Sequence, residues 1–516
     1  MMDLRVLLIS PPAESAVKQV IGTAAPPLGL AYLASVARDL GCDVRIVDSQ
    51  AEGLGLRDIR AEIKRFYPDV VGVTATTPMI YDAYDVAAVA KEVDPDAMVV
   101  IGGPHVTFTA SETLQECKHI DAVVRGEGEL TFGELLMKLM RNDRDLRGVL
   151  GVTYRADGEV RENPPRPLIP DLDKVPIPAY DLLPMDKYRV GRTKFGVVMT
   201  SRGCPYNCIF CSSSIQFGRR WRAHSVDRVL EELRILSEEY GRKEIEFLDD
   251  TFTLNERRVL EIAERIVREG LDISWSASSR VDTFSRKVGS AMRRAGAHTV
   301  YFGIESGSER TLEFIGKGIT KEQSLTATRA AKESGLRTLG SFVIGFPHET
   351  EDDIRKTVEF SKRVGVDLAQ FTIATPYPGT RLWDLAVRAG LLLTRDWRRF
   401  TTLDVVMRSI YLAPEKIKKL LLWAYLSFYL SPRRALEDLI RNRGFILRRA
   451  VPAAFRFIKN TILDKVRGGS RFAFLLRLAE DLRRRKPEEV LRKLRQIPMD
   501  IGYEEVRLRL GLRGSS

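Results

Sequence analysis

Short apolar runs rich in β-branched residues alternate with longer amphipathic segments in the first part of the chain. Five runs have the length and composition of buried strands, at residues 5–9, 43–47, 70–74, 98–101 and 122–124. Segments with a helical spacing of apolar residues separate them, at 28–40, 59–66, 81–93 and 132–140. Such alternation is typical of βα units on a parallel sheet. We therefore expect an α/β protein whose residues 1–145 form a doubly wound, flavodoxin-like domain, with ligands at the carboxyl ends of its strands.

A proline-rich connector follows this domain. Seven prolines lie between Pro164 and Pro184, after a predicted hairpin over residues 154–160 that turns at Asp157 and Gly158. Proline cannot continue a helix or a central strand, and closely spaced prolines stiffen a linker. Residues 146–190 are therefore interpreted as a hairpin and a stiff linker between domains.

The βα alternation resumes at wider spacing after the linker. Strands are predicted at residues 197–200, 244–248, 273–277, 300–304, 339–344 and 369–374. Helices are predicted between them, at 226–240, 257–269, 287–295, 321–333 and 351–364. Consecutive βα units of this kind indicate a partial (β/α)6 barrel over residues 191–395, with its chemistry at the carboxyl ends of the strands. Residues 396–516 have a mainly helical pattern.

Composition and charge narrow the class of protein. The chain has 516 residues, of which 44% are hydrophobic, so it is neither a disordered chain nor a single ordinary domain. Its formal net charge is +12, but residues 416–486 alone hold 19 Lys+Arg against 5 Asp+Glu, which leaves −2 for the rest. The basic excess therefore belongs to one C-terminal region, and we expect no nucleic-acid partner.

The basic C-terminal region also contains large apolar and aromatic residues, from residue 420 onward. Such helices can lie in a membrane interface, where anionic lipid attracts Lys and Arg. The alternative is a helical cap whose apolar side packs on the barrel. The N-terminus has no signal-peptide pattern, and the apolar stretch at 420–430 is shorter than the ~20 residues of a spanning helix. We expect a cytoplasmic protein, with or without a peripheral membrane contact.

Three of the five cysteines lie in one short segment, as Cys204, Cys208 and Cys211 with C-x3-C-x2-C spacing. A zinc ribbon would need a second ligand pair, and the nearest histidine, His224, has no partner in the sequence. Three thiolates in a tight loop suit three irons of a [4Fe–4S] cluster and leave the fourth iron open. Three buried structural cysteines are the alternative. Cys42 and Cys117 are interpreted as buried small hydrophobes.

C-x3-C-x2-C after the first strand of a βα barrel resembles the radical S-adenosylmethionine (SAM) enzymes, over about residues 190–385. The resemblance implies that SAM chelates the open iron and is cleaved to a 5′-deoxyadenosyl radical. It implies SAM contacts from the cysteine loop and successive strand ends, at Phe210, Asp249, Asp250, Arg280, Glu305, Ser306 and Gly345. Arg280 would pair with the SAM carboxylate and Glu305 with the ribose hydroxyls. Taken singly, the aspartates could instead cap a helix, and Arg280 and Glu305 could be surface charges.

His348 stands where relatives commonly have glycine, so the resemblance does not fix the backbone conformation at that position.

The first domain resembles the cobalamin-binding domain of a large class of radical SAM enzymes. The resemblance rests on residues 26–30, 73–77, 101–107 and 125–129, and implies cobalamin contacts at Leu28, Thr74, Thr76, Gly102, Gly103, His105, Gly126 and Glu127. Small and hydroxyl side chains leave room for a flat corrin, and glycines let the backbone approach it. No D-x-H-x-x-G occurs, so no histidine is placed to ligate cobalt in the usual way. A core role for His105, and a domain that has lost cobalamin, are the alternatives.

These resemblances imply a cobalamin-dependent radical SAM methyltransferase or cyclase that modifies an unactivated carbon. The chain is similar to hopanoid lipid C-methylases, archaeal tetraether-lipid-modifying enzymes and the anaerobic Mg-protoporphyrin ester cyclase. Expected partners are a hydrophobic small-molecule or lipid substrate and an electron donor such as ferredoxin or flavodoxin. A tRNA methylthiotransferase would need three further N-terminal cysteines, where only Cys42 and Cys117 occur. A non-catalytic corrinoid-binding or membrane-adaptor protein is disfavoured by the intact cysteine set. No catalytic residue is assigned.

Overall fold

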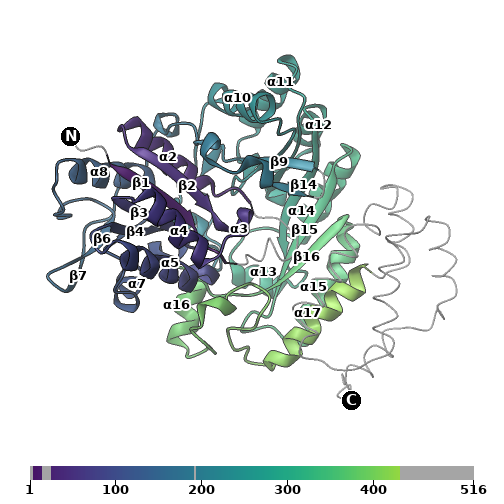
Figure 1. The fold of residues 1–516 in the computed structure, drawn as a ribbon. Helices are drawn as coiled ribbons and strands as arrows, with labels where there is room; N and C mark the ends of the chain where they lie inside the picture. The colour runs from purple at the N-terminus through teal and green to yellow at the C-terminus, as the bar shows by residue number, and fades with distance from the viewer. Residues whose placement is uncertain (1–3, 14–24, 191–192, 430–516) are drawn as a thin grey trace.

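The computed structural model describes residues 4–13, 25–190 and 193–429. Two sheets lie side by side, each covered by helices, and Figure 1 shows the N-terminal one in purple and blue and the second in teal and green. The sheets correspond to the two predicted α/β units. The predicted fold class, a doubly wound domain followed by a partial barrel, is confirmed.

The first sheet has the strand order β2-β1-β3-β4-β5-β6-β7. Its strands are β1 (Arg5–Ser10), β2 (Asp43–Asp48), β3 (Val70–Thr74), β4 (Met98–Gly102), β5 (Ala122–Val124), β6 (Val152–Ala156) and β7 (Glu159–Glu162). β1 to β5 are parallel, and β6 and β7 form an antiparallel hairpin that extends the sheet from β5. The hairpin turns at Asp157 and Gly158, whose φ angles of 52° and 81° suit a tight two-residue turn.

Helices cover both faces of this sheet because alternate side chains of the buried strands point to opposite sides. Val6 and Leu8 of β1 pack in one core with α2 (Leu28–Asp39) and α8 (Gly128–Met140). Leu7 and Ile9 pack in a second core with α4 (Leu56–Phe66) and α5 (Ile80–Val93). Three short helices complete the domain, α3 (Ser49–Glu52), α6 (Pro104–Phe108) and α7 (Ala110–Glu116).

The second sheet has the order β16-β15-β14-β13-β12-β9-β8, with β9 to β16 parallel. Its strands are β8 (Arg189–Val190), β9 (Thr193–Val198), β12 (Glu244–Phe247), β13 (Ser274–Ser279), β14 (Ala297–Glu305), β15 (Arg337–Ile344) and β16 (Leu368–Ile373). Five helices cover its outer face, α10 (Val226–Arg234), α11 (Glu256–Arg268), α12 (Arg286–Arg294), α14 (Lys321–Glu333) and α15 (Glu351–Val364). Within the described part of the chain β16 does not pair with β9, so the barrel is open.

The linker is packed between the two units. It contains three single turns, η2 (Leu172–Lys174), η3 (Tyr180–Leu182) and η4 (Met185–Lys187). The hydroxyl of Tyr188 donates to Asp48 of the first sheet at 2.8 Å, and that of Tyr180 donates to Val197 O of the barrel at 3.0 Å. The linker thereby fixes the two sheets relative to each other.

Helix α17 (Pro414–Tyr429) lies along the open edge of the barrel (Figure 1). The hydroxyls of Tyr425 and Tyr429 each accept from a backbone N–H and donate to a backbone C=O of β16, at Phe371 and Ala369, over 2.9–3.1 Å. Four helical residues rise about 6 Å and two strand residues about 6.8 Å, so the two spacings match. The two tyrosine hydroxyls thus bond backbone groups at the edge of β16 that would otherwise be free to pair with another strand.

Helix α17 therefore packs on the barrel, as one of the two alternatives predicted. Most of the basic segment, and with it the predicted membrane contact, falls at 430–516, outside the described residues. None of the helices in the described ranges is long and apolar enough to cross a membrane.

Candidate active site

The cysteine loop follows β9 and the two-residue strand β10 (Ser201–Arg202), at the carboxyl end of the barrel. Gly203 begins it with a φ of 86°, and a Cβ there would lie 2.5 Å from Arg220 O, so only glycine fits. The backbone N–H of Cys204 donates to Gly218 O at 3.3 Å. The loop thus presents three partly exposed thiols, none of them in a disulfide.

No three His, Cys, Asp or Glu side chains in the described residues gather closely enough to hold a single metal ion. A [4Fe–4S] cluster makes a different demand, because each thiolate binds a different iron. Three thiols spread along one loop fit such a cluster and do not fit a zinc site.

Arg280 lies at the end of β13, directly beside the cysteine loop. Its guanidinium carbon is 3.3 Å from the ring centroid of Tyr206, within that loop. It donates to both carboxylate oxygens of Asp282, at 2.9 and 2.8 Å, and to Lys317 O at 2.8 Å. Arg280 is only 4% exposed, so it is a fixed, buried cation at this edge of the barrel. The alternative of a surface charge does not hold.

Glu305 ends β14 with a φ of 64°, which is uncommon for a residue other than glycine. It is buried, and its carboxylate pairs with the Lys317 ammonium at 2.5 Å. Lys317 also donates to the C=O of Gly303 at 2.8 Å, and a Cβ on Gly303 would lie 2.2 Å from that ammonium. A strained backbone at a buried charged residue is a feature of functional sites.

Sequence patterns did not identify Lys317. The only local signal in the sequence is its position between two glycines, Gly316 and Gly318. In the structure both glycines have a positive φ. Burial raises the pKa of Cys208 to about 11, while Lys317 and Arg280 act in the opposite direction. The structure therefore brings two cations, the carboxylates of Asp282 and Glu305 and the cysteine loop together at the carboxyl ends of β9, β13 and β14.

Asp249 and Asp250 follow β12 and have different surroundings. Asp249 is 2% exposed and accepts three hydrogen bonds, from the Thr200 N–H at 2.7 Å and from the hydroxyls of Thr200 and Ser201 at 2.6 Å. These bonds hold the turn that leads into the cysteine loop. Burial raises the pKa of Asp250, and a hydrogen bond with Ser213 opposes this effect. A SAM contact from either aspartate stays a prediction.

The loop after β15 is held by a buried carboxylate. Glu349 accepts from the N–H groups of Gly345 at 2.6 Å and Phe346 at 3.0 Å, and burial raises its pKa to about 7. The ring of Phe210, in the cysteine loop, lies 6.1 Å from that of Phe346. The predicted residues Phe210 and Gly345 are thereby brought to the same place. Ser306 instead bonds to the Thr357 hydroxyl at 2.9 Å and is fully buried.

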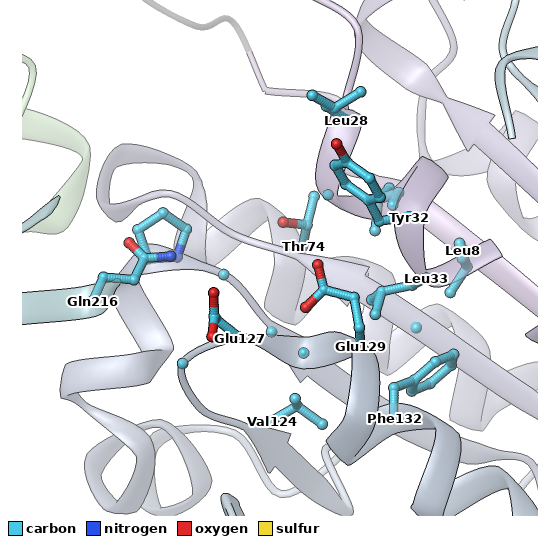
Figure 2. Close-up of a pocket in the computed structure, with 18 of the residues that line it drawn as sticks. Leu8, Leu28, Tyr32, Leu33, Thr74, Val124, Glu127, Glu129, Phe132 and Gln216 are labelled. Carbon is cyan, nitrogen blue, oxygen red and sulfur yellow. The ribbon is translucent and has the colours of Figure 1, made fainter. Parts of the chain in front are cut away.

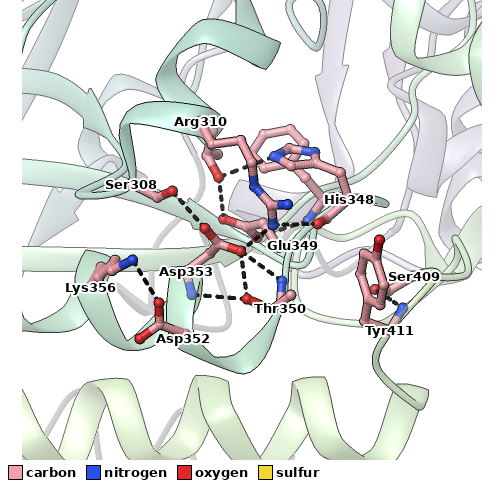
Figure 3. Close-up of polar contacts among 12 residues, drawn as sticks. Ser308, Arg310, His348, Glu349, Thr350, Asp352, Asp353, Lys356, Ser409 and Tyr411 are labelled. Atoms are coloured by element: carbon pink, nitrogen blue, oxygen red, sulfur yellow. Dashed lines mark hydrogen bonds and ion pairs between the residues drawn. The ribbon is translucent and has the colours of Figure 1, made fainter.

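His348 and its neighbours form the polar cluster of Figure 3, below this loop. Asp353 accepts from the hydroxyls of Ser308 and Thr350, both at 2.7 Å, and from Arg310. His348 has no left-handed φ, so the side chain fits its backbone without the conformation that favours glycine. The cluster anchors the start of α15 beneath the β15 loop.

A cavity of about 260 Å³ opens at the carboxyl ends of the first sheet, facing the barrel. Leu8, Leu33, Val124 and Phe132 give it an apolar floor, and polar groups surround its mouth (Figure 2). It is lined by six of the eight residues predicted to contact cobalamin: Leu28, Thr74, Gly102, Gly103, Gly126 and Glu127. Barrel residues complete the lining, namely Met199, Arg202, Gln216 and Phe217. A cavity with an apolar floor and small residues at its mouth fits part of a large amphiphilic cofactor.

The other two predicted contacts lie elsewhere. Thr76 is exposed outside the cavity. His105 is 2% exposed, its Nδ1 lies 3.2 Å from the Thr77 hydroxyl, and its ring meets that of Trp397 edge-on at 4.8 Å. Burial lowers its pKa to about 4. His105 thus has the core role that was the alternative, and no histidine of the described residues lines the cavity.

Comparison with known proteins agrees with this geometry. Residues 198–361 match the radical SAM superfamily and residues 14–136 match the B12 binding domain. The chain is 59% identical over 453 residues to an uncharacterised methyltransferase of Pyrococcus horikoshii, covering 88% of this chain and 98% of the relative. It is 32% identical over 393 residues to the anaerobic magnesium-protoporphyrin IX monomethyl ester cyclase of Rubrivivax gelatinosus, covering 74% of this chain and 69% of that enzyme.

The fold is similar to the solved structure of TsrM, a radical SAM methyltransferase from Kitasatospora setae with cobalamin and a [4Fe–4S] cluster bound. The TM-score is 0.70 at 18% identity, with 96% of this chain and 99% of that chain covered. At this identity the likeness shows the fold alone. The sequence matches agree with the two sites described above, the cysteine loop and the corrinoid cavity. The chain therefore belongs to the B12-binding radical SAM enzymes, with a [4Fe–4S] cluster, SAM and cobalamin as its cofactors.

Proposed function

We propose that this enzyme transfers a methyl group to an unactivated carbon. The observation that supports methylation over cyclisation is the 59% identity, across 98% of its length, to a relative named as a methyltransferase. The cyclase is more distant, at 32%. When bound, the cluster, SAM and the corrinoid would supply the electron, the radical precursor and the methyl group.

The protein's own residues bind and orient these groups. Cys204, Cys208 and Cys211 would hold the cluster, and Arg280 and Lys317 would place positive charge beside it and beside the SAM carboxylate. Glu305 would accept from ribose hydroxyls once Lys317 turns to the ligand. The corrinoid cavity of the first sheet is also lined by Arg202, two residues before Cys204, so substrate would lie between the corrinoid and the cluster.

The substrate proposed is an amphiphile such as a membrane lipid. Ile410 and Tyr411, 65% and 60% exposed, lie beside Pro347 at the carboxyl end of β15, where an apolar group could contact them. Two neighbouring barrel strands carry polar side chains in contact, with the Tyr301 hydroxyl 3.2 Å from that of Ser276. The polar part of such a molecule would enter the barrel. An electron donor such as ferredoxin or flavodoxin would reduce the cluster.

Methyl transfer is tested with SAM that carries a deuterated methyl group. The reconstituted enzyme is incubated with this SAM, a reductant and a metabolite extract of a strain that lacks the gene, and products are read by mass spectrometry. A metabolite that gains the deuterated methyl supports the proposal, whereas a product formed without label indicates cyclisation. Cys208→Ala should abolish the labelled product and the bound iron. Cys42→Ala, in the buried core of the first domain, should preserve both.

The lipid part of the proposal is tested by vesicle flotation. Ile410→Ser and Tyr411→Ser should reduce recovery of the full chain with anionic vesicles, because each removes exposed apolar surface. The control is Val267→Ser, since Val267 is 55% exposed but lies on α11, on the outer face of the barrel. Equal recovery of all three variants and wild type would count against a lipid contact at this rim.

A further inference from the structure

The inner face of the barrel sheet is mostly polar and partly open. A Cβ on Gly196 of β9 would lie 3.3 Å from both Ile245 of β12 and Leu236, which follows α10, so Ile245 faces the outer helices. Side chains alternate along a strand, and Glu246 therefore points to the inside. The middle of this inner face carries Glu246, Ser276, Ser278, Tyr301, Leu339 and Ser341, of which only Leu339 is apolar and only Ser276 is fully buried. Closed barrels fill this space with bulky branched side chains, so the open barrel has room for a ligand here.

Three polar groups of the inner face meet at one place. Glu246 and Ser276 are direct register partners on β12 and β13, and neighbouring strands lie about 4.8 Å apart. The Tyr301 hydroxyl extends from β14 and donates to the Ser276 hydroxyl at 3.2 Å. Burial raises the pKa of Tyr301 to about 12, and the negative charge of Glu246 acts in the same direction. A carboxylate and two hydroxyls from three adjacent strands thus share one region of the barrel.

Glu246 is the member of this group that lacks a partner. Within the described ranges its carboxylate receives no hydrogen bond, and the charged group that acts on it is another carboxylate, Glu244. Glu244 is itself compensated, since its Oε1 lies 2.6 Å from Nε2 of His298, while Arg337 donates to Nδ1 of that ring at 3.0 Å. Glu246 is partly exposed and its oxygens are not sealed from solvent, so a ligand can reach them. A half-buried charge without a partner is unfavourable in the free protein and is a feature of binding sites.

The chemistry of the ligand follows from these groups. An ionised carboxylate only accepts hydrogen bonds, and the Tyr301 hydroxyl, which donates to Ser276, has lone pairs left to accept. The complementary group must therefore donate hydrogen bonds. An ammonium or a pair of hydroxyls does so, whereas a phosphate or carboxylate would be repelled by Glu246.

We infer that Glu246 and Tyr301 bind the polar group of the substrate inside the barrel, through hydrogen bonds that an ammonium or hydroxyls of the substrate donate. The inference rests on the proposed function, methyl transfer to an amphiphile, and adds the chemical class of its polar end. Tyr301 lies four residues before Glu305 on β14, which is about 13 Å along the strand. The methylated carbon would therefore lie in a part of the substrate remote from this polar group, towards the cysteine loop.

The test uses Glu246→Gln in the reconstituted full-length enzyme, with the deuterated-methyl SAM and the metabolite extract described above. The extract concentration that gives half-maximal labelling should rise at least about tenfold, because a charge-assisted hydrogen bond to the substrate is lost. Tyr301→Phe should raise it about fivefold. Iron and cobalamin content should be unchanged, and the thermal midpoint of the cofactor-free Glu246→Gln protein should stay the same or rise. Glu264→Gln is the matched control, since Glu264 is exposed on α11, on the outer face of the barrel.

Extract whose amines have been acetylated distinguishes the two sources of the contact. Loss of the labelled product after this treatment identifies an ammonium as the bound group, and retention identifies hydroxyls. The inference is overturned if Glu246→Gln and Glu264→Gln need the same extract concentration, or if Glu246→Gln lowers the thermal midpoint, as a purely structural carboxylate would. A wild-type product without the deuterated methyl would refute methyl transfer instead, and the same comparison of variants on that product would still decide whether Glu246 binds the substrate.

Discussion

Glu127 joins the two domains of the enzyme, and we expect its substitution to lower the free energy of unfolding. The carboxylate lies at the start of α8 and accepts from Arg222 at 2.9 and 2.8 Å, from the Ile169 N–H at 2.8 Å and from Arg202 at 3.2 Å. The side chains of Glu127, Arg202 and Arg222 are only 3–4% exposed. Glu127→Gln keeps the shape and one acceptor oxygen but removes the charge, which leaves the guanidinium of Arg222 with neutral acceptors only, including the backbone carbonyls of Ile169 and Phe217.

Breaking a buried ion pair by removing one partner costs about 3–5 kcal/mol. Arg202 retains Glu129, so we expect the lower end for Glu127→Gln, about 3 kcal/mol of unfolding free energy. The control is Asp272→Asn, whose pair with Lys243 is 66–83% exposed and should contribute about 0–1 kcal/mol. The contrast separates the cost of a buried pair from that of a solvated one.

The assay is urea unfolding of the cofactor-free proteins, followed by tryptophan fluorescence and by circular dichroism. Adding Arg222→Met to Glu127→Gln should cost less than the sum of the two single changes, because the second change removes the uncompensated charge left by the first. The reasoning is refuted if Glu127→Gln costs no more than Asp272→Asn, or if the double variant shows no coupling.

Three further outcomes are expected. Gly203→Ala should abolish bound iron after reconstitution, because its Cβ would meet Arg220 O at 2.5 Å, whereas Gly270→Ala, at a φ of 67° in open space, should retain iron and lose about 1–2 kcal/mol. Burial raises the pKa of Glu349 from 4.5 to about 7, so the folded protein binds more protons than the unfolded chain in this range, and the stabilisation present at low pH is lost as pH rises through 7. Glu349→Gln should make the thermal midpoint fall less between pH 5 and 7, because this carboxyl contributes about 3 kcal/mol to the pH dependence of the unfolding free energy. An unchanged pH dependence of the midpoint would contradict the burial argument. Tyr425→Phe should destabilise the fold by about 1–3 kcal/mol in chemical denaturation, since it leaves the N–H and C=O of Phe371 unpaired at the barrel edge, while the same change at the exposed Tyr411 should have little effect.

The amino-acid sequence by itself determined the elements and the cysteine loop. Each predicted strand of both sheets occurs within a few residues of its expected position, because a strand buried on both faces needs a continuous apolar run that is visible locally. The spacing of Cys204, Cys208 and Cys211 likewise lies within one loop, so no tertiary information was needed to recognise it.

Which strand-end residues share a site was decided by the tertiary structure. Thr74 and Gly103 reach the corrinoid cavity, but His105, two residues further along, turns into α6 and packs on Trp397, which lies almost three hundred residues away. The sequence pattern is the same for residues that face a cavity and for residues that face a neighbouring helix. Only the packing of distant segments distinguishes them.

The partners of buried charges were also invisible in the sequence. Lys317 with Glu305, and Arg202 with Glu127 and Glu129, pair across loops and across the two domains. Local sequence patterns show the spacing of apolar residues and the size of side chains. A buried charge, in contrast, is stabilised by whichever group the fold brings within hydrogen-bond distance, and that group can come from a distant segment.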